Sequence, residues 1–155
     1  MQSKEQISSI LKDMIVANNN RVKGYEKAVD ETTTVDIDLH AIFNSMANDS
    51  RRYVSDLIHE VIILGGESAK TNHPEKILSE WMGGTKPFTK SDRQTILTSC
   101  DYGEEATQKA YTEALSSIVG IDSKIRKMLN DQQASLKIAH SLIKKYGGFL
   151  VDVSR

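Results

Sequence analysis

Two stretches of the chain repeat one pattern, NNNRVKGYEKAV at residues 18–29 and EEATQKAYTEAL at residues 104–115. When residue 18 is aligned with residue 104, Tyr25 falls opposite Tyr111. Around both stretches the apolar residues recur three and four positions apart, which is the spacing of one face of an α-helix. The repeat therefore predicts two equivalent helices, one in each half of the chain.

The same periodicity predicts four long helices. Their expected ranges are 3–30, from Asp36 or Asp38 to Gly65, 91–118 and 122–146. Ser3 followed by Gln6 has the form of a capping box at the start of the first helix. Asp36 and Asp38 suit the N-terminus of the second helix, where acidic side chains are favourable. Ser91 followed by Gln94 marks the expected start of the third.

The connections between these helices predict how they are arranged. The first pair and the second pair are each joined by a short turn, so each pair forms a helical hairpin. A long connector, at about residues 66–90, contains both prolines of the chain and an expected short helix at Pro74–Met82. Such a connector can cross the length of a bundle. The expected fold class is therefore all-α, a ferritin-like four-helix bundle with one long crossover.

Composition limits the kinds of protein that the chain can be. Its 155 residues suffice for one domain, 1–155, that buries a core and ends in a short tail at 147–155. The net charge is −1 and no basic face dominates, so we expect no nucleic-acid partner. No apolar run approaches the ~20 residues of a membrane span. The single cysteine, Cys100, excludes an intrachain disulfide, and we expect a cytoplasmic protein.

Several segments resemble a known family. They are GYEKA at 24–28, LGGE at 64–67, YGEEATQKAYTEAL at 102–115 and ASLKIAHSLIKK at 134–145. Together they are similar to a family of small bacterial ferritin-like four-helix-bundle proteins that is catalogued as a domain of unknown function. The resemblance covers the chain from about Ile7 to Lys145. It implies the fold, and it implies little about activity.

One polar position inside the repeat suggests where a site lies. Ferritin-like di-iron centres use one Glu from each of two helices and a Glu-x-x-His from each of the other two. In that superfamily, the Glu of the first helix commonly lies seven residues before an inward Tyr. Here Asn18 lies seven residues before Tyr25, and Glu104 lies seven before Tyr111. Asn18 and Glu104 thus occupy the two single-Glu positions, and one of them has lost its charge.

The other two helices match the di-iron pattern less well. His140 lies near the apolar seam of the fourth helix, but the residue three before it is Lys137. A di-metal site needs about six protein ligands, so we do not expect an oxygen-activating di-iron centre. A single iron, manganese or zinc ion is the remaining metal hypothesis. Its candidate ligands are Glu104, His140, Asn18, Asp49 and Gln133.

Glu104 needs a partner in any case, because a buried and unpaired carboxylate is costly and tends to take up a proton. It can join a structural polar layer that includes Tyr25, Tyr111 and Gln132, with Asn18, Gln133 or His140 as further members. It can instead ionise next to a protonated His140, or it can bind one metal ion.

Two functions are consistent with these features. The first is a non-catalytic helical bundle with a structural or interaction role, stress-associated by analogy with other small ferritin-like proteins. A homodimer through an outer helix face fits this function, and no protein partner can be named. The alternative is a divalent-metal-binding protein of the iron type that uses Glu104 and His140. The sequence contains no Gly-rich phosphate loop and no paired-cysteine zinc pattern.

Overall fold

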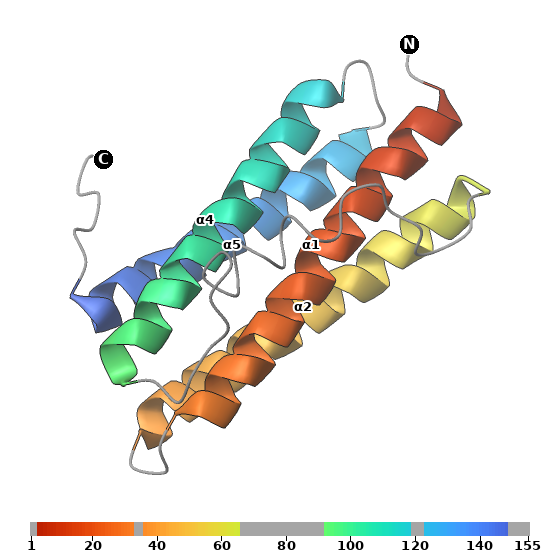
Figure 1. Cartoon of the computed structure of the whole chain (residues 1–155). Helices are drawn as coiled ribbons and strands as arrows, with labels where there is room; N and C mark the ends of the chain where they lie inside the picture. The colour runs from red at the N-terminus through yellow and green to blue at the C-terminus, as the bar shows by residue number, and fades with distance from the viewer. Residues whose placement is uncertain (1–2, 33–35, 66–91, 119–122, 149–155) are drawn as a thin grey trace.

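The computed structural model describes residues 3–32, 36–65, 92–118 and 123–148 (Figure 1). Four helices make up these ranges: α1 (Lys4–Glu31), α2 (Ile37–Ile63), α4 (Arg93–Ser117) and α5 (Ser123–Gly147). No strand occurs within them. The expected all-α four-helix bundle is confirmed, and each helix ends within about two residues of its expected range.

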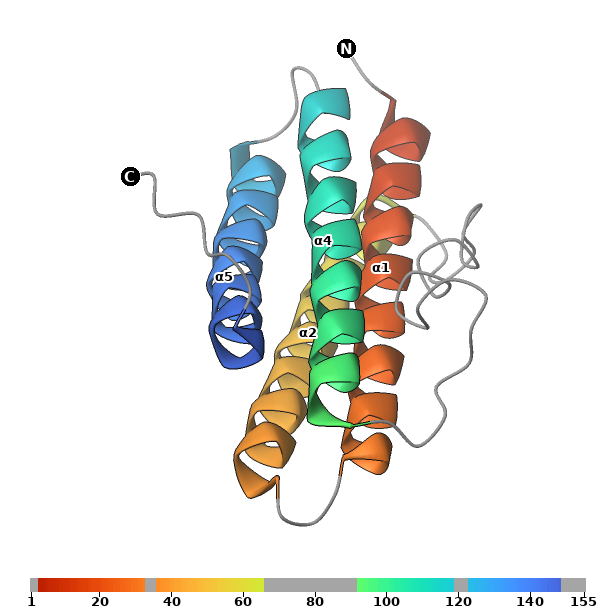
Figure 2. The same cartoon turned by 60° about the vertical axis from the view of Figure 1, so that its left-hand side comes forward.

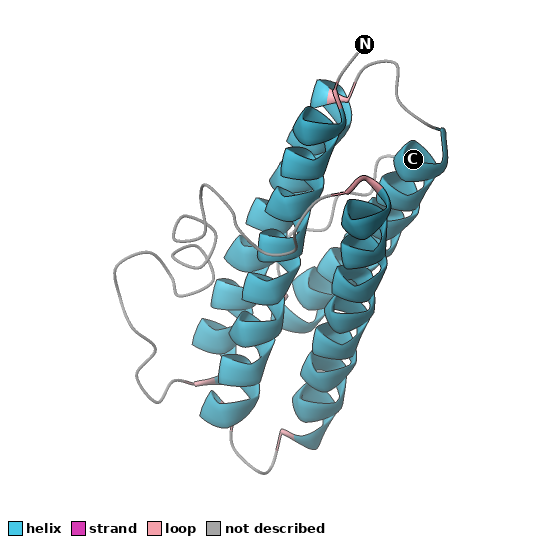
Figure 3. Cartoon of the chain, turned by 90° about the vertical axis from the view of Figure 1, so that its right-hand side faces the viewer, coloured by secondary structure: helices cyan, strands magenta, loops and turns pink. Residues whose placement is uncertain are grey.

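The helices run in the expected directions. Figures 1 and 2 show α1 and α2 as one antiparallel hairpin and α4 and α5 as another, with α2 and α4 running the same way. α1 packs against both α2 and α4, whereas α5 packs mainly against α4 and meets α2 only briefly (Figure 3). The expected helix at Pro74–Met82 and residues 149–155 of the expected C-terminal tail lie outside the described residues.

The start of α1 has the predicted capping box. The Ser3 hydroxyl accepts from the Gln6 backbone N–H at 3.2 Å, and the Gln6 side chain accepts from the Ser3 N–H at 2.9 Å. Gly65 follows the end of α2 with a φ of 81°, a left-handed conformation that glycine adopts without a steric penalty. Local sequence chemistry therefore sets these two helix ends.

The predicted start of the third helix needs correction, and the predicted start of the second is confirmed without its expected capping bond. The cap of α4 is Asp92 rather than Ser91, and its side chain accepts from the Thr95 N–H at 2.8 Å. Asp36 precedes α2, but its side chain makes no capping hydrogen bond. Asp36 and Asp38 instead each bind the guanidinium of Arg93 at 2.8 Å. These carboxylates thus join the start of α2 to the start of α4, because a charged partner is available across the bundle.

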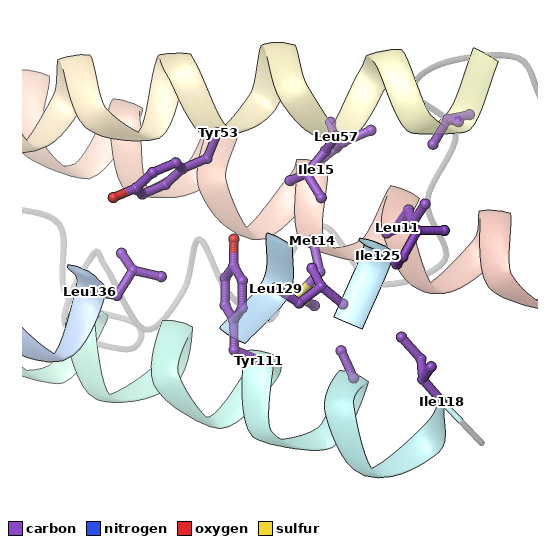
Figure 4. Close-up of a cluster of buried hydrophobic side chains, with 12 residues drawn as sticks. Leu11, Met14, Ile15, Tyr53, Leu57, Tyr111, Ile118, Ile125, Leu129 and Leu136 are labelled. Carbon is purple, nitrogen blue, oxygen red and sulfur yellow. The ribbon is translucent and has the colours of Figure 1, made fainter. Parts of the chain in front are cut away.

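The buried apolar residues form two clusters, one toward each end of the bundle. The first cluster lies where α1 and α5 begin and α2 and α4 end (Figure 4). It contains Leu11, Met14, Ile15, Tyr53, Leu57, Val61, Tyr111, Ala114, Ile118, Ile125, Leu129 and Leu136. The second contains Tyr25, Ala28, Leu39, Phe43, Met46, Ala47, Ile96, Leu97, Cys100 and Ile143. Burying each large aliphatic side chain contributes about 1.5–3 kcal/mol, so the two clusters hold the helices together.

None of the described helices has both the length and the apolarity that crossing a membrane requires.

Candidate functional site

Between the two apolar clusters, all four helices contribute buried polar side chains. We call this set the polar layer. Its members are Asn18, Arg21 and Tyr25 of α1, Ser50 of α2, Glu104 and Tyr111 of α4, and Gln132 of α5. Each is at most 4% exposed. Because none of these groups reaches water, the layer must satisfy its hydrogen bonds and charges internally.

An ion pair lies at the centre of the polar layer. The guanidinium of Arg21 donates from Nε to Glu104 Oε1 at 3.0 Å and from Nη2 to Glu104 Oε2 at 2.9 Å. This is the two-pronged geometry in which arginine binds a carboxylate most strongly. The Tyr25 hydroxyl also donates to Glu104 Oε2, at 2.5 Å. Both oxygens of Glu104 are therefore bonded.

The remaining nitrogen of Arg21 links the ion pair to α2. Its Nη1 donates to the Ser50 hydroxyl at 2.8 Å and to the backbone carbonyl of Met46 at 3.0 Å. Every nitrogen of this buried guanidinium thus has an acceptor. A buried charge pair whose other hydrogen bonds are also made has the best chance of offsetting its desolvation.

From Ser50 the hydrogen bonds continue through Asn18 to α4 and α5. The Ser50 hydroxyl donates to Asn18 Oδ1 at 2.9 Å, and Asn18 Nδ2 donates to the Met14 carbonyl at 2.9 Å and to the Tyr111 hydroxyl at 2.8 Å. The Tyr111 hydroxyl donates to Gln132 Oε1 at 2.6 Å. One connected network therefore passes through all four helices.

Burial and charge set the protonation states in and beside the layer. Burial opposes the charge of Arg21, but Glu104 and its neighbours outweigh burial and raise the Arg21 pKa. Burial and the charge of Glu104 raise the pKa of Tyr25, and burial raises the pKa of Tyr111. Burial also raises the pKa of the Cys100 thiol. At neutral pH the layer thus contains a permanent cation, neutral hydroxyls and no thiolate beside it.

The internal repeat is visible in the contacts of the layer. Asn18 of α1 bonds to Tyr111 of α4, and Glu104 of α4 bonds to Tyr25 of α1. These two cross-contacts join repeat-equivalent positions, as a pseudo-twofold arrangement of the two hairpins requires. Arg21 breaks the symmetry, because its repeat equivalent is Thr107, whose hydroxyl donates to the Gly103 carbonyl of its own helix at 2.9 Å.

The structure brings together five of the residues that the sequence singled out. They are Asn18, Tyr25, Glu104, Tyr111 and Gln132. All five lie in the polar layer and are joined by the network described above.

Three of the candidate metal ligands have other partners. His140 Nε2 lies 2.7 Å from Asp101 Oδ1, an atom that Lys144 also approaches at 3.1 Å. Gln133 Nε2 donates to the Thr112 hydroxyl at 2.9 Å. Both residues thus have partners outside the polar layer.

The remaining candidate ligand, Asp49 of α2, pairs within its own helix. Its Oδ1 accepts from Arg52 at 3.2 Å, and both side chains are more than one-third exposed. His140, Gln133 and Asp49 therefore each have a contact outside the polar layer. Within the described helices, no group of three or more His, Cys, Asp or Glu side chains is placed so that it could hold a metal ion. The polar layer contains one carboxylate that could bind a metal ion, Glu104, and the guanidinium of Arg21 already binds that carboxylate.

Arg21 and Ser50 are the two members of the layer whose roles the sequence reasoning missed. Arg21 lies on the apolar face of α1, three residues after Asn18 and four before Tyr25. An arginine in such a position cannot remain buried without an anion. Asking which carboxylate could reach it would have pointed to Glu104, the one carboxylate that falls in the seam of the third predicted helix.

Comparison with known proteins agrees with this architecture. Among solved structures, a mutant of Dps1 from Mycobacterium smegmatis superposes with a TM-score of 0.78, over 93% of this chain and 96% of that chain. The two sequences are 11% identical, so this likeness shows the fold alone, and the fold is ferritin-like. No curated protein matches the sequence significantly.

A family comparison covers the part of the chain that supplies most of the polar layer. Residues 6–117 match the model of the family described as Domain of unknown function (DUF2383). This range includes every layer residue of α1, α2 and α4. The matched range exceeds half of the chain, and the chain therefore belongs to the DUF2383 family.

Proposed function

We propose that this protein is a non-catalytic ferritin-like bundle with a structural or interaction role, in which a fixed ion pair takes the place of metal ligands. The observation that supports this most directly is the two-pronged contact between Arg21 and Glu104. Glu104 is the residue at the single-Glu position of the ferritin-like pattern. Its counter-charge here is an arginine of the same chain.

A metal ion at Glu104 would have to displace Arg21. The guanidinium is 1% exposed and remains protonated at all accessible pH values, so it would stay buried beside a second cation. An uncompensated buried charge costs several kcal/mol. Metal binding would therefore require α1 to rearrange. The buried Arg21 therefore favours the structural role over the divalent-metal alternative that uses Glu104 and His140.

The closed character of the layer argues against catalysis there. Substrate sites are concave and keep a few polar groups free to bind the substrate. In the polar layer, by contrast, Arg21, Glu104 and Asn18 already use their hydrogen-bonding groups on one another and on neighbouring helices. To bind a substrate, these groups would have to break buried hydrogen bonds, which is costly.

Under this proposal the bundle acts through its outer surface, either on a protein partner or as a homodimer. A stress-associated role belongs to the same proposal. Sedimentation velocity over a concentration series measures the homodimer directly. A single species with the mass of one chain at every concentration would remove the homodimer from the proposal and leave the protein partner.

The main test is metal content. The untagged protein is purified, loaded with Fe(II), Mn(II) or Zn(II), desalted and analysed for bound metal. A Glu104→Ala/His140→Ala variant and an Arg51→Met variant are treated in the same way. Arg51 is a suitable control because its exposed pair with Glu26, at 2.6 Å, joins α2 to α1 outside the polar layer.

We expect sub-stoichiometric metal in all three proteins. One equivalent of metal in the wild type and the Arg51 variant, lost in the double variant, would overturn the proposal and establish the metal-binding alternative.

A further inference from the structure

The hydrogen-bond network of the polar layer has one open end. Gln132 is 4% exposed, and its Oε1 accepts from Tyr111 at 2.6 Å. Its Nε2 is buried and donates to no other group among the described residues. Leaving a buried amide donor without an acceptor is destabilising, and native proteins rarely do so.

The direction of the network fixes which end of the Gln132 amide is open. Ser50 donates to Asn18 Oδ1, so Asn18 presents its Nδ2 to the Tyr111 hydroxyl. The Tyr111 oxygen thereby accepts a hydrogen bond, and its own proton must go to an acceptor, which is Gln132 Oε1. If the amide were flipped, the proton of the Tyr111 hydroxyl would have no acceptor. The free group is therefore the N–H of Gln132 and not its carbonyl oxygen.

A second polar group points into the same part of the interior. Tyr53 of α2 is 7% exposed, and no other described residue bonds to its hydroxyl. In Figure 4 the hydroxyls of Tyr53 and Tyr111 both point into the space between α2 and α4. Burial raises the pKa of Tyr111, and charge repulsion from Tyr53 adds to the increase.

We propose that one buried water molecule binds here, accepting from Gln132 Nε2 and hydrogen-bonding to the Tyr53 hydroxyl. The charge of the layer selects a neutral ligand. Glu104 already matches the charge of Arg21, so an added anion would be buried without a counter-charge. A cation would meet the N–H of Gln132. Water can accept from the amide and still donate, and buried waters typically make about three such hydrogen bonds.

The water would also connect two helices that contact each other little. α5 meets α2 only briefly, and their one described ion pair, Lys124 with Glu60 at 3.5 Å, lies near the far end of the first apolar cluster. A water between Gln132 and Tyr53 would add a link at mid-bundle and close the network from α5 back to α2. This inference goes beyond the proposed function and does not depend on it.

The first experiment uses the wild-type protein. Nuclear Overhauser and rotating-frame spectra are recorded between the Gln132 side-chain amide protons and water. We expect cross-peaks with the sign of a long-lived bound water. Gln133 provides the reference, because its Nε2 already donates to Thr112. An amide of Gln132 that shows no water contact beyond that of Gln133 would overturn the proposal.

The second experiment uses a Tyr53→Phe variant, a Gln132→Met variant and a Gln133→Met control. Oxygen-17 relaxation dispersion counts long-lived internal waters, and we expect one fewer in Gln132→Met and no change in Gln133→Met. Urea unfolding of Tyr53→Phe, Gln132→Met and the double variant should show coupling of about fivefold in the unfolding equilibrium constant. An unchanged water count in Gln132→Met would refute the site, and additive effects would refute the link to Tyr53.

Discussion

Replacing Arg21 by methionine tests the central contact of the polar layer. The substitution keeps the length of an apolar stem but removes the cation that binds Glu104 through two hydrogen bonds. Tyr25 can still donate to the carboxylate, but no positive charge remains within the layer. Removing one member of a buried ion pair typically costs about 3–5 kcal/mol. We therefore expect the free energy of unfolding to fall by about that amount.

This loss is large for a protein of this size. Domains are usually stable by about 5–15 kcal/mol in total. For a domain of about 150 residues, each 1 kcal/mol lowers Tm by roughly 2–4 °C, so Arg21→Met should lower Tm by roughly 6–20 °C. Urea unfolding followed by circular dichroism at 222 nm measures the change, and an unchanged m-value would show that the folded state stays compact.

Two further variants separate the buried ion pair from general effects of charge. Arg51→Met removes an exposed pair with Glu26 and should change stability by no more than about 0.5 kcal/mol. Arg21→Met/Glu104→Met removes both charges and should be more stable than Arg21→Met, because no unpaired charge stays buried. If Arg21→Met is no more harmful than Arg51→Met, the ion pair does not stabilise the layer and the reasoning is wrong.

Three further predictions concern single groups. Because the pKa values of Tyr25 and Tyr111 are raised, the folded state keeps both phenol protons above pH ~10 and loses stability there relative to the unfolded chain. The phenolate absorbance of both residues should therefore appear only when circular dichroism shows that the protein unfolds. The buried Cys100 thiol, with its raised pKa, should react with a thiol reagent only as fast as the bundle opens, and immediate labelling of folded protein would contradict its burial. Gly65→Ala should cost about 1 kcal/mol in urea unfolding through its φ of 81° alone, since nothing lies within 4 Å of an added Cβ; an unchanged midpoint would show that the turn adapts.

The fold could be predicted because its signals are local or repeat along the chain. Apolar residues at helical spacing mark four helices, and the capping box of Ser3 and Gln6 marks a helix start that the structure confirms. The long connector implies the crossover. The start of α2 after Asp36 is confirmed, but the expected capping bond of Asp36 and the helix start at Ser91 were wrong, because capping depends on which partners are available. Arg93, distant in sequence, takes the carboxylate of Asp36, and Asp92 takes the cap position.

The site was only partly predictable, because helical spacing does not fix how helices are rotated against one another. Asn18 and Glu104 were found from their constant distance to an inward tyrosine. His140 lies at the edge of its apolar stripe, and such a residue can face either the core or a neighbouring helix. Packing decides between these, and here His140 lies 2.7 Å from Asp101 of α4. Arg21 was passed over because its position alone does not say which helix supplies its anion.

The polar layer explains why one repeated position holds an amide in α1 and a carboxylate in α4. Arg21 brings a single positive charge, and Glu104 alone neutralises it. A second carboxylate at position 18 would leave the buried layer with a net negative charge. Asn18 also accepts from Ser50 while it donates to Met14 and Tyr111, whereas an ionised carboxylate can only accept. The two repeats differ at this position because the layer contains one arginine. A single cation needs only one carboxylate, so Glu104 keeps the charge and Asn18 does not.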